Sequence, residues 1–308
     1  MNQRDVEDLF GGPLRADPYI SLKAPPLPDA KIGPLPKIQF VIEFVGPRSI
    51  SGASANALAE PQLRSALGSP EVWTMNQSSN EWAPLRANVN ITYDSLAVAW
   101  DLITDAGTMT TASARQLLAA VERFATDVQR RAMPMPVPES VDPLVRHWIA
   151  VRESLDIGFS MAVARDGDDL AEREIWRLCA ALGLNLGPTG AFEWRIEGWE
   201  HPLLAVTPLE ADAFSLRDVN LDAKHRGLGL GFNVPRSPSP SASLEGCFGI
   251  ANQFALRTGS KLFDDTMAPM TPADQESLRS DLNEAVKALA SAGLTPGCSE
   301  ALKLFGAA

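Results

Sequence analysis

The chain has 308 residues, of which 45% are hydrophobic, and its formal net charge at pH 7 is −11. A globular protein of this length has room for two domains, each with its own hydrophobic core. The excess of acidic residues argues against a nucleic-acid partner, because clustered Lys and Arg would be needed to neutralise the phosphates.

Residues 1–36 are rich in proline and carry no periodic pattern of apolar residues. Such a segment cannot build a core, so we predict a Pro-rich flexible linker or tail. The sequence contains no stretch of about 18 apolar residues, and its beginning lacks the hydrophobic centre of a signal peptide. We therefore expect this chain alone to be soluble.

Residues 37–137 are predicted to form a first α+β module. Ile38, Phe40, Ile42 and Phe44 alternate with other residues, which is typical of a strand with one face in a core. The other elements expected here are a helix at 60–67, strands at 73–75, 89–93 and 96–102, and a helix at 112–130.

Residues 138–154 are predicted to be a linker and a connecting helix, and residues 155–308 a second module. Thr271 followed by Pro272 is a strong signal for the start of its last helix, and Gly259 is placed to end the helix before it. The elements expected in this module are strands at 157–163, 192–196, 203–207, 228–234 and 261–263, and helices at 171–182, 242–257 and 272–293.

The two modules repeat one another. The strand Ile38–Phe44 returns as Ile157–Val163, and Leu96–Trp100 returns as Leu228–Phe232. A period of more than a hundred residues indicates a duplicated domain, because solenoid units repeat every 20–50 residues or so. The fold class predicted is α+β: two tandem split β-α-β sandwiches, each an antiparallel sheet with helices on one face.

Nothing in the sequence points to catalysis or to a bound cofactor. The run Gly227–Gly231 alternates as a strand, whereas a phosphate-binding glycine loop must lie between a strand and a helix. The three histidines lie far apart in sequence, and we expect them at the surface: His147, His201 and His225. The three cysteines are scattered, and two of them fall on apolar helix stripes: Cys179 and Cys247, in addition to Cys298. We predict no enzyme, no metal site and no cofactor.

Five segments of the second module resemble, in the same order, the C-terminal domain of the ZipA family of bacterial division proteins. These segments are Asp156–Gly167, Ala181–Gly187, Pro202–Phe214, Leu228–Pro235 and Leu262–Thr266 with the Met270–Pro272 sequel. The whole chain, duplication included, resembles the longer proteins of this family, and its first module is the poorer, degenerate match. The fold expected from the resemblance is a sheet backed by helices on one face.

The resemblance implies a non-enzymatic cell-division adaptor whose second module binds the C-terminal tail of FtsZ and helps link the division ring to the membrane. It also implies a location on the cytoplasmic side of the bacterial inner membrane, at the division site. Family members ordinarily carry an N-terminal membrane anchor before a Pro-rich linker. This sequence has the linker without the anchor, so we expect membrane contact only through an anchor absent from this chain or through partner proteins.

Strand alternation predicts which residues form the open sheet face. If Phe159 and Met161 point to the helices, their neighbours point away from them. The FtsZ-peptide site expected on this basis, with two positions taken from the family, is Ser160, Ala162, Thr189, Ala191, Ala205, Thr207, Leu209, Gly229, Gly231 and Asn233. The family's best-known binder has Phe where Gly231 stands, and Met where Thr189 and Leu209 stand, so the floor here is small and smooth.

Two alternatives stay open from the sequence. The protein could be a scaffold or regulatory division protein whose sheet face is covered by the first module or by another partner, because glycines permit close approach. The first module could itself be a structural copy or a second docking site for another division protein. By strand parity its open face would be more polar, formed by Gln39, Val41, Glu43, Ala97, Ala99 and Asp101.

Overall fold

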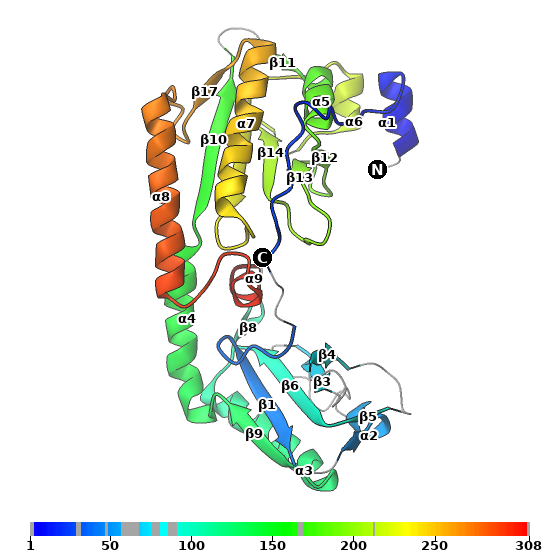
Figure 1. Cartoon of the computed structure of the whole chain (residues 1–308), viewed down its shortest axis with the longest axis vertical. Coiled ribbons are helices and arrows are strands. Elements are labelled where there is room, and N and C mark those ends of the chain that lie inside the picture. The colour runs from blue at the N-terminus through cyan, green and yellow to red at the C-terminus, as the bar shows by residue number, and fades with distance from the viewer. Residues whose placement is uncertain are drawn as a thin grey trace. The chain divides into compact units, whose positions relative to one another are not determined.

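The structure is a computed structural model that describes residues 3–28, 32–46, 49–56, 68–75, 81–85, 91–165, 169–211 and 213–306. The chain divides into two compact units (Figure 1). One consists of Met1–Pro28 and Asp156–Gly297, and the other of Asp29–Leu155 and Cys298–Ala308. We name them after their central strands, as the β10 unit and the β1 unit respectively.

The β10 unit is built on an antiparallel sheet. Over the described residues its strand order is β12-β13-β14-β16-β10-β17. The bounds are Gly158–Ala164 for β10, Asn185–Leu186 for β12, Phe192–Trp194 for β13, Leu204–Pro208 for β14, Gly227–Asn233 for β16 and Lys261–Phe263 for β17. A small ladder, β11 (Leu170–Ala171) with β15 (Lys224–His225), lies beside it.

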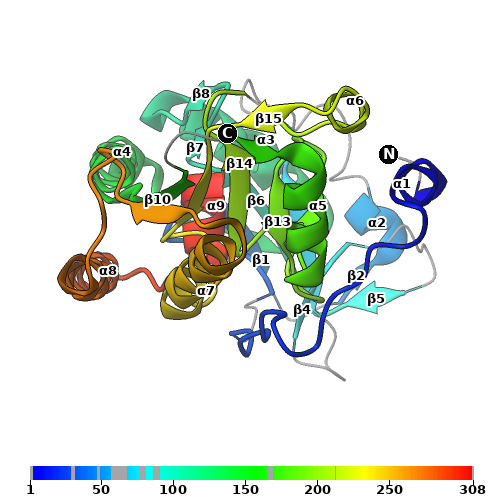
Figure 2. The same cartoon turned by 90° about the horizontal axis from the view of Figure 1, so that it is seen from above.

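The helices of this unit cover one face of the sheet. Helix α7 (Pro240–Thr258) packs against β10, β14 and β16, and α8 (Pro272–Ser291) packs against α7 (Figures 1 and 2). Helix α5 (Glu172–Ala181) meets the same face, since Trp176 lies edge-on against Phe192 of β13 at 5.1 Å between ring centroids. The predicted signals hold: Thr271 caps α8, Pro272 opens it, and Gly259 ends α7 with φ of 70°.

The N-terminal segment is not the free tail that we expected, because residues up to Pro28 pack on the β10 unit. Helix α1 (Gln3–Phe10) ends with Phe10 stacked on Trp176 at 5.8 Å between ring centroids. Arg173 donates a 2.7 Å hydrogen bond to the carbonyl of Leu9, and its guanidinium lies over the Phe10 ring. Leu9 and Phe10, which make these contacts, end a helix of 8 residues before the first proline, Pro13, and so short a helix gives little periodic signal in a sequence.

The β1 unit has a second antiparallel sheet, whose order over the described residues is β4-β3-β6-β1-β9. The bounds are Gln39–Val45 for β1, Glu71–Met75 for β3, Trp82–Pro84 for β4, Ser95–Asp101 for β6 and Arg131–Met135 for β9. Short ladders join β2 (Ile50–Ser51) to β5 (Thr92–Tyr93), and β7 (Ile103–Thr104) to β8 (Gly107–Thr108). The helix predicted at 60–67 lies outside the described residues, as does part of the strand predicted at 89–93.

Helices of the β1 unit extend the predicted first module at both ends. Helix α3 (Thr111–Asp127) packs on β1 and β9, and a short helix α2 spans Gly52–Asn56. Helix α4 (Val141–Leu155), predicted to be a connector, belongs to this unit, since its Trp148 donates to the carbonyl of Lys37 at 2.5 Å. Helix α9 (Ser299–Gly306) also belongs here and not to the second module as expected.

The two sheets share their central part. In the β1 unit, β1 lies between β6, which precedes helix α3 in the chain, and β9, which follows that helix. In the β10 unit, β10 lies in the same way between β16, which precedes α7, and β17, which follows it. The Met/Pro-rich stretch after α3 forms β9 at the sheet edge, where proline is tolerated. The sheets differ beyond these strands. In the β1 unit the earlier strand of the next pair, β3, lies beside β6, and β4 follows at the edge. In the β10 unit the later strand, β14, lies beside β16, and β13 follows further out.

Candidate functional site

The face of the β10 sheet opposite α7 carries small side chains in two cross-strand rows. The register pairs Ala205 with Gly231 and Gly231 with Ser160 in one row. The second row, one pair further along the strands, is Thr207, Gly229 and Ala162. Directly paired residues in antiparallel strands point to the same side. Strand parity therefore brings these residues together on one floor.

The floor is closed at one end by Leu209. This residue follows β14, and a Cβ built on Gly229 would lie 3.7 Å from Leu209 Cδ2 and 3.3 Å from Thr207 Oγ1. A Cβ on Gly227 would come within 2.7 Å of Leu209 Cδ1, so a side chain there would displace Leu209. Glycines thus let Leu209 fold over the strand, and its side chain stays 40% exposed.

The predicted site residues differ in how much surface they offer. Gly229, Gly231 and Asn233 are half-buried, as are Ala205 and Thr207, and Ser160 is exposed. Ala162 and Ala191 are buried, at 4% and 6% exposure, so they support the floor and offer little of its surface. Thr189 is exposed, but it lies in the turn between β12 and β13, outside both rows.

Sequence reasoning missed a charged pair beside the floor. Glu193 pairs with Ala205 in the register, so it lies on the same face, yet it is only 5% exposed. Its carboxylate accepts a 2.5 Å hydrogen bond from Arg195 Nε, and the backbone of Gly187 lies so close that no side chain would fit there. The alternation of Phe192 and Trp194 towards the helices is the signal that predicts the orientation of Glu193.

A hollow of about 200 Å³ opens at the Gly231 end of the floor. Its lining combines the small floor residues with two basic side chains: His201, Pro202, Leu204, Ala205, Gly231, Phe232, Asn233 and Arg236. Asn233 fixes the chain at this point, because its Oδ1 accepts from the backbone N–H of Arg236 at 3.1 Å. Its Nδ2 donates to Asp156 at 2.6 Å.

The corresponding face of the β1 unit is not the exposed polar floor that we expected. Val41, Ala97 and Ala99 are at most 1% exposed, because Trp73 and Trp82 pack over them. Gln39 is fully buried as well. Parity placed these residues correctly on one face, but tryptophans from β3 and β4 cover most of it.

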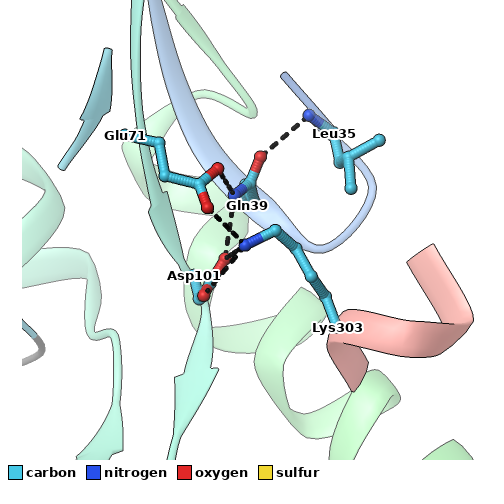
Figure 3. A network of polar contacts seen from close by, with 5 residues as sticks. All are labelled: Leu35, Gln39, Glu71, Asp101 and Lys303. Carbon is cyan, nitrogen blue, oxygen red and sulfur yellow. Dashed lines mark hydrogen bonds and ion pairs between the residues drawn. The ribbon is translucent and has the colours of Figure 1, made fainter. Parts of the chain in front are cut away.

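The polar part of that face is an ion-pair network (Figure 3). Lys303 of α9 lies 2.7 Å from Glu71 Oε1 and 3.2 Å from Asp101 Oδ1, and Gln39 Nε2 donates to both carboxylates at 3.0 and 2.8 Å. The backbone N–H of Leu35 donates to Gln39 Oε1 at 2.9 Å. Two distant segments, 32–38 and α9, are thereby tied to the sheet.

The charges of this network support one another. Burial on its own would lower the pKa of Lys303, but its bonds to Glu71 and Asp101 outweigh burial and raise that pKa. Burial likewise opposes ionisation of Glu71, yet the hydrogen bonds from Lys303 and Gln39 hold the pKa of its carboxyl below the ordinary value. Both groups are therefore charged at neutral pH.

One histidine departs from the surface location that we expected. His225 of β15 is 6% exposed, and its Nε2 lies 3.2 Å from Oε2 of the fully buried Glu172. The other carboxylate oxygen accepts from Trp176 Nε1 and from the backbone N–H of Ser215, both at 3.0 Å. Glu172 thereby joins α5, β15 and the start of α6 (Leu216–Asn220). We therefore assign these bonds a structural role.

The described residues contain no group of three or more His, Cys, Asp or Glu side chains placed to hold a metal ion. Cys179 and Cys247 are buried, as expected, and burial raises the pKa of the Cys247 thiol to about 12. Within the same described parts, every helix is too short or too polar to cross a membrane. The open floor is the main candidate for a site.

The β10 unit thus belongs to the class of α+β domains in which helices cover one side of an antiparallel sheet and leave the other side available. Residues 157–281 match the family model described as ZipA, C-terminal FtsZ-binding domain. This part of the chain is similar to the FtsZ-binding domain of the ZipA family. The match spans β10 to the first half of α8 and leaves the β1 unit outside it. Comparison with the curated proteins finds no match.

Proposed function

We propose that the β10 unit binds the C-terminal tail of FtsZ across the floor of β14, β16 and β10. The observation that carries this proposal is the combination of the family match with the two cross-strand rows, since the matched residues include all three strands. Within β14, β16 and β10 the largest side chain in either row is that of Thr207, and larger ones begin only on the neighbouring strands, at Glu193 and Phe263. A peptide can therefore lie close to the strand backbone and supply the large apolar side chains itself.

The glycines of β16 support a bound partner. Glycine in a strand interior costs roughly 0.5–1 kcal/mol relative to alanine. Gly229 and Gly231 have ordinary backbone angles for a strand, so no turn or positive φ requires them there. A surface that must accept a close-lying chain gives a physical reason for glycine at these positions.

The chain then acts as a non-enzymatic adaptor that helps link the division ring to the inner membrane, on its cytoplasmic side. In this account the β1 unit is a degenerate structural copy of the module. Trp73 and Trp82 cover part of the same face of the β1 unit, and the Lys303 network occupies its polar part. Both observations disfavour the alternative that this face docks another division protein.

The test is an isothermal titration of the full chain with a peptide of the FtsZ C-terminal tail. Gly231→Arg places a long side chain over the floor and should abolish binding. Its Cβ would lie 3.0 Å from the carbonyl of Phe159, so the strand must give by a few tenths of an ångström. Gly229→Arg is the milder second variant. Its Cβ would lie 3.3 Å from Thr207 Oγ1 and 3.7 Å from Leu209 Cδ2, and the nearest backbone atom would be 4.0 Å away.

Ala290→Arg is the matched control, since it adds the same side chain at an exposed position on α8. It should bind the peptide like the wild type, and thermal melting should show all three variants folded. The scaffold alternative, with the face covered by another partner, predicts no saturable binding by the wild type at tens of micromolar peptide. That result would remove the proposed function, and undiminished binding by folded Gly231→Arg and Gly229→Arg would move the site elsewhere.

A further inference from the structure

Arg236 lines the hollow at the Gly231 end of the floor, and its guanidinium is incompletely satisfied. The Nε atom is buried from water and has no hydrogen-bond partner among the described residues. In the parts of the chain that are described, no Asp or Glu side chain forms an ion pair with Arg236. Asp156, an acidic side chain at the same end of the sheet, hydrogen-bonds instead to Asn233.

A buried N–H of a charged group is costly to leave without an acceptor. Arginine presents its donors in a planar fork that fits the two oxygens of a carboxylate. The Arg236 backbone is fixed by its hydrogen bond to Asn233, so the side chain starts from a defined point at the end of β16. Among the described residues no acceptor is bonded to the Nε atom, so the guanidinium can still take an acceptor from a partner.

His201 adds a second donor to the same hollow. A neutral imidazole carries one N–H and a protonated one carries two, so this residue can donate in either state. Apart from Asn233, the rest of the lining is small or apolar: Pro202, Leu204, Ala205, Gly231 and Phe232. A hollow of about 200 Å³ has room for a carboxyl group and its short stem.

We propose that Arg236, assisted by His201, binds a carboxylate of the peptide that lies on the floor, and so fixes the register and direction of that peptide. The proposal rests on the tail-binding function proposed above. The carboxylate is either an acidic side chain of the tail or its C-terminal carboxylate, and both have the same chemistry. Apolar contacts along the floor tolerate sliding, whereas one charged anchor at its end specifies a single position.

The experiment compares the wild type with Arg236→Met and Arg236→Gln in titrations with the tail peptide at two salt concentrations. Both variants should bind about tenfold more weakly or worse, the expected loss for one charge-assisted pair. Affinity should also depend less on salt than in the wild type. Arg257→Met is the matched control, because Arg257 is exposed on the last turn of α7, outside the floor.

Peptide variants identify the carboxylate. One peptide is amidated at its C-terminus, and others carry Asn or Gln in place of each acidic residue. The peptide that lacks the bound carboxylate should bind the wild type more weakly than the unmodified peptide does. It should bind Arg236→Met with the same affinity as it binds the wild type. A merely structural role of Arg236 would weaken all peptides equally.

The possible outcomes separate this proposal from the function on which it rests. If the wild type does not bind the tail, both are overturned. If it binds, and the Arg236 variants bind with unchanged affinity and salt dependence, only the carboxylate site is wrong. If the Arg236 variants bind every peptide more weakly by the same factor, including the peptide that lacks the carboxylate, the carboxylate site is wrong as well.

Discussion

Replacing Lys303 by Met should destabilise the β1 unit, because it removes the cation that two carboxylates share. Half-exposed ion pairs contribute about 0.2–1 kcal/mol each, and Lys303 makes two, to Glu71 and to Asp101. The substitution also leaves the carboxylates, which both accept from Gln39 Nε2, with an uncompensated repulsion. Together these effects amount to about 2 kcal/mol.

Differential scanning calorimetry measures this loss. For a unit of this size about 2 kcal/mol corresponds to a fall in Tm of roughly 4–8 °C. Lys287→Met is the matched control, because Lys287 pairs with Glu284 on the exposed surface of α8, where both side chains are at least 70% exposed. The control should shift Tm by less than about 1 °C. Equal shifts for the two variants would refute the role assigned to the network.

The remaining predictions concern the pH dependence of this network and two further contacts. The folded pKa of Glu71 is lowered and that of Lys303 is raised, so the Tm difference between the wild type and Lys303→Met should persist at neutral pH. It should shrink as pH falls below the ordinary Glu value of 4.5 or rises through the ordinary Lys value of 10.5; a difference that is flat from pH 3 to pH 11 would contradict this. Glu172→Ala should cost the β10 unit about 3 kcal/mol in chemical denaturation, because Trp176 Nε1, the part-buried backbone N–H of Ser215 and the His225 ring lose their partner; a loss below about 1 kcal/mol would show that these bonds contribute little. Phe10→Ala should speed cleavage between residues 11 and 28 in limited proteolysis, because it removes the stack on Trp176; an unchanged cleavage rate would mean that this stack does not hold the segment.

Strand parity made the sheet faces predictable. A period of two assigns every residue of a strand to one side, so the sequence alone was enough to place Ser160, Gly231 and Ala205 together. The helix ends at Pro272 and Gly259 followed from residues whose backbone preferences are strong.

The sequence could not show what covers a face. Long-range contacts decide this, and they leave no local pattern. Trp73 and Trp82 lie far along the chain from the Val41 that they bury, and Lys303 lies 232 residues from Glu71. The buried His225 escaped prediction similarly, because its partner Glu172 looks like an ordinary acidic residue in the first turn of a helix.

The central claim is that the FtsZ tail rests on the floor of the β10 unit. Backbone amide chemical shifts of the isotope-labelled full chain, followed during addition of the tail peptide, test it most directly. The account predicts saturable changes at Ser160, Gly229 and Gly231, with Val41 and Ala97 of the β1 unit unaffected. Changes confined to the β1 unit, or no changes at all, would contradict it.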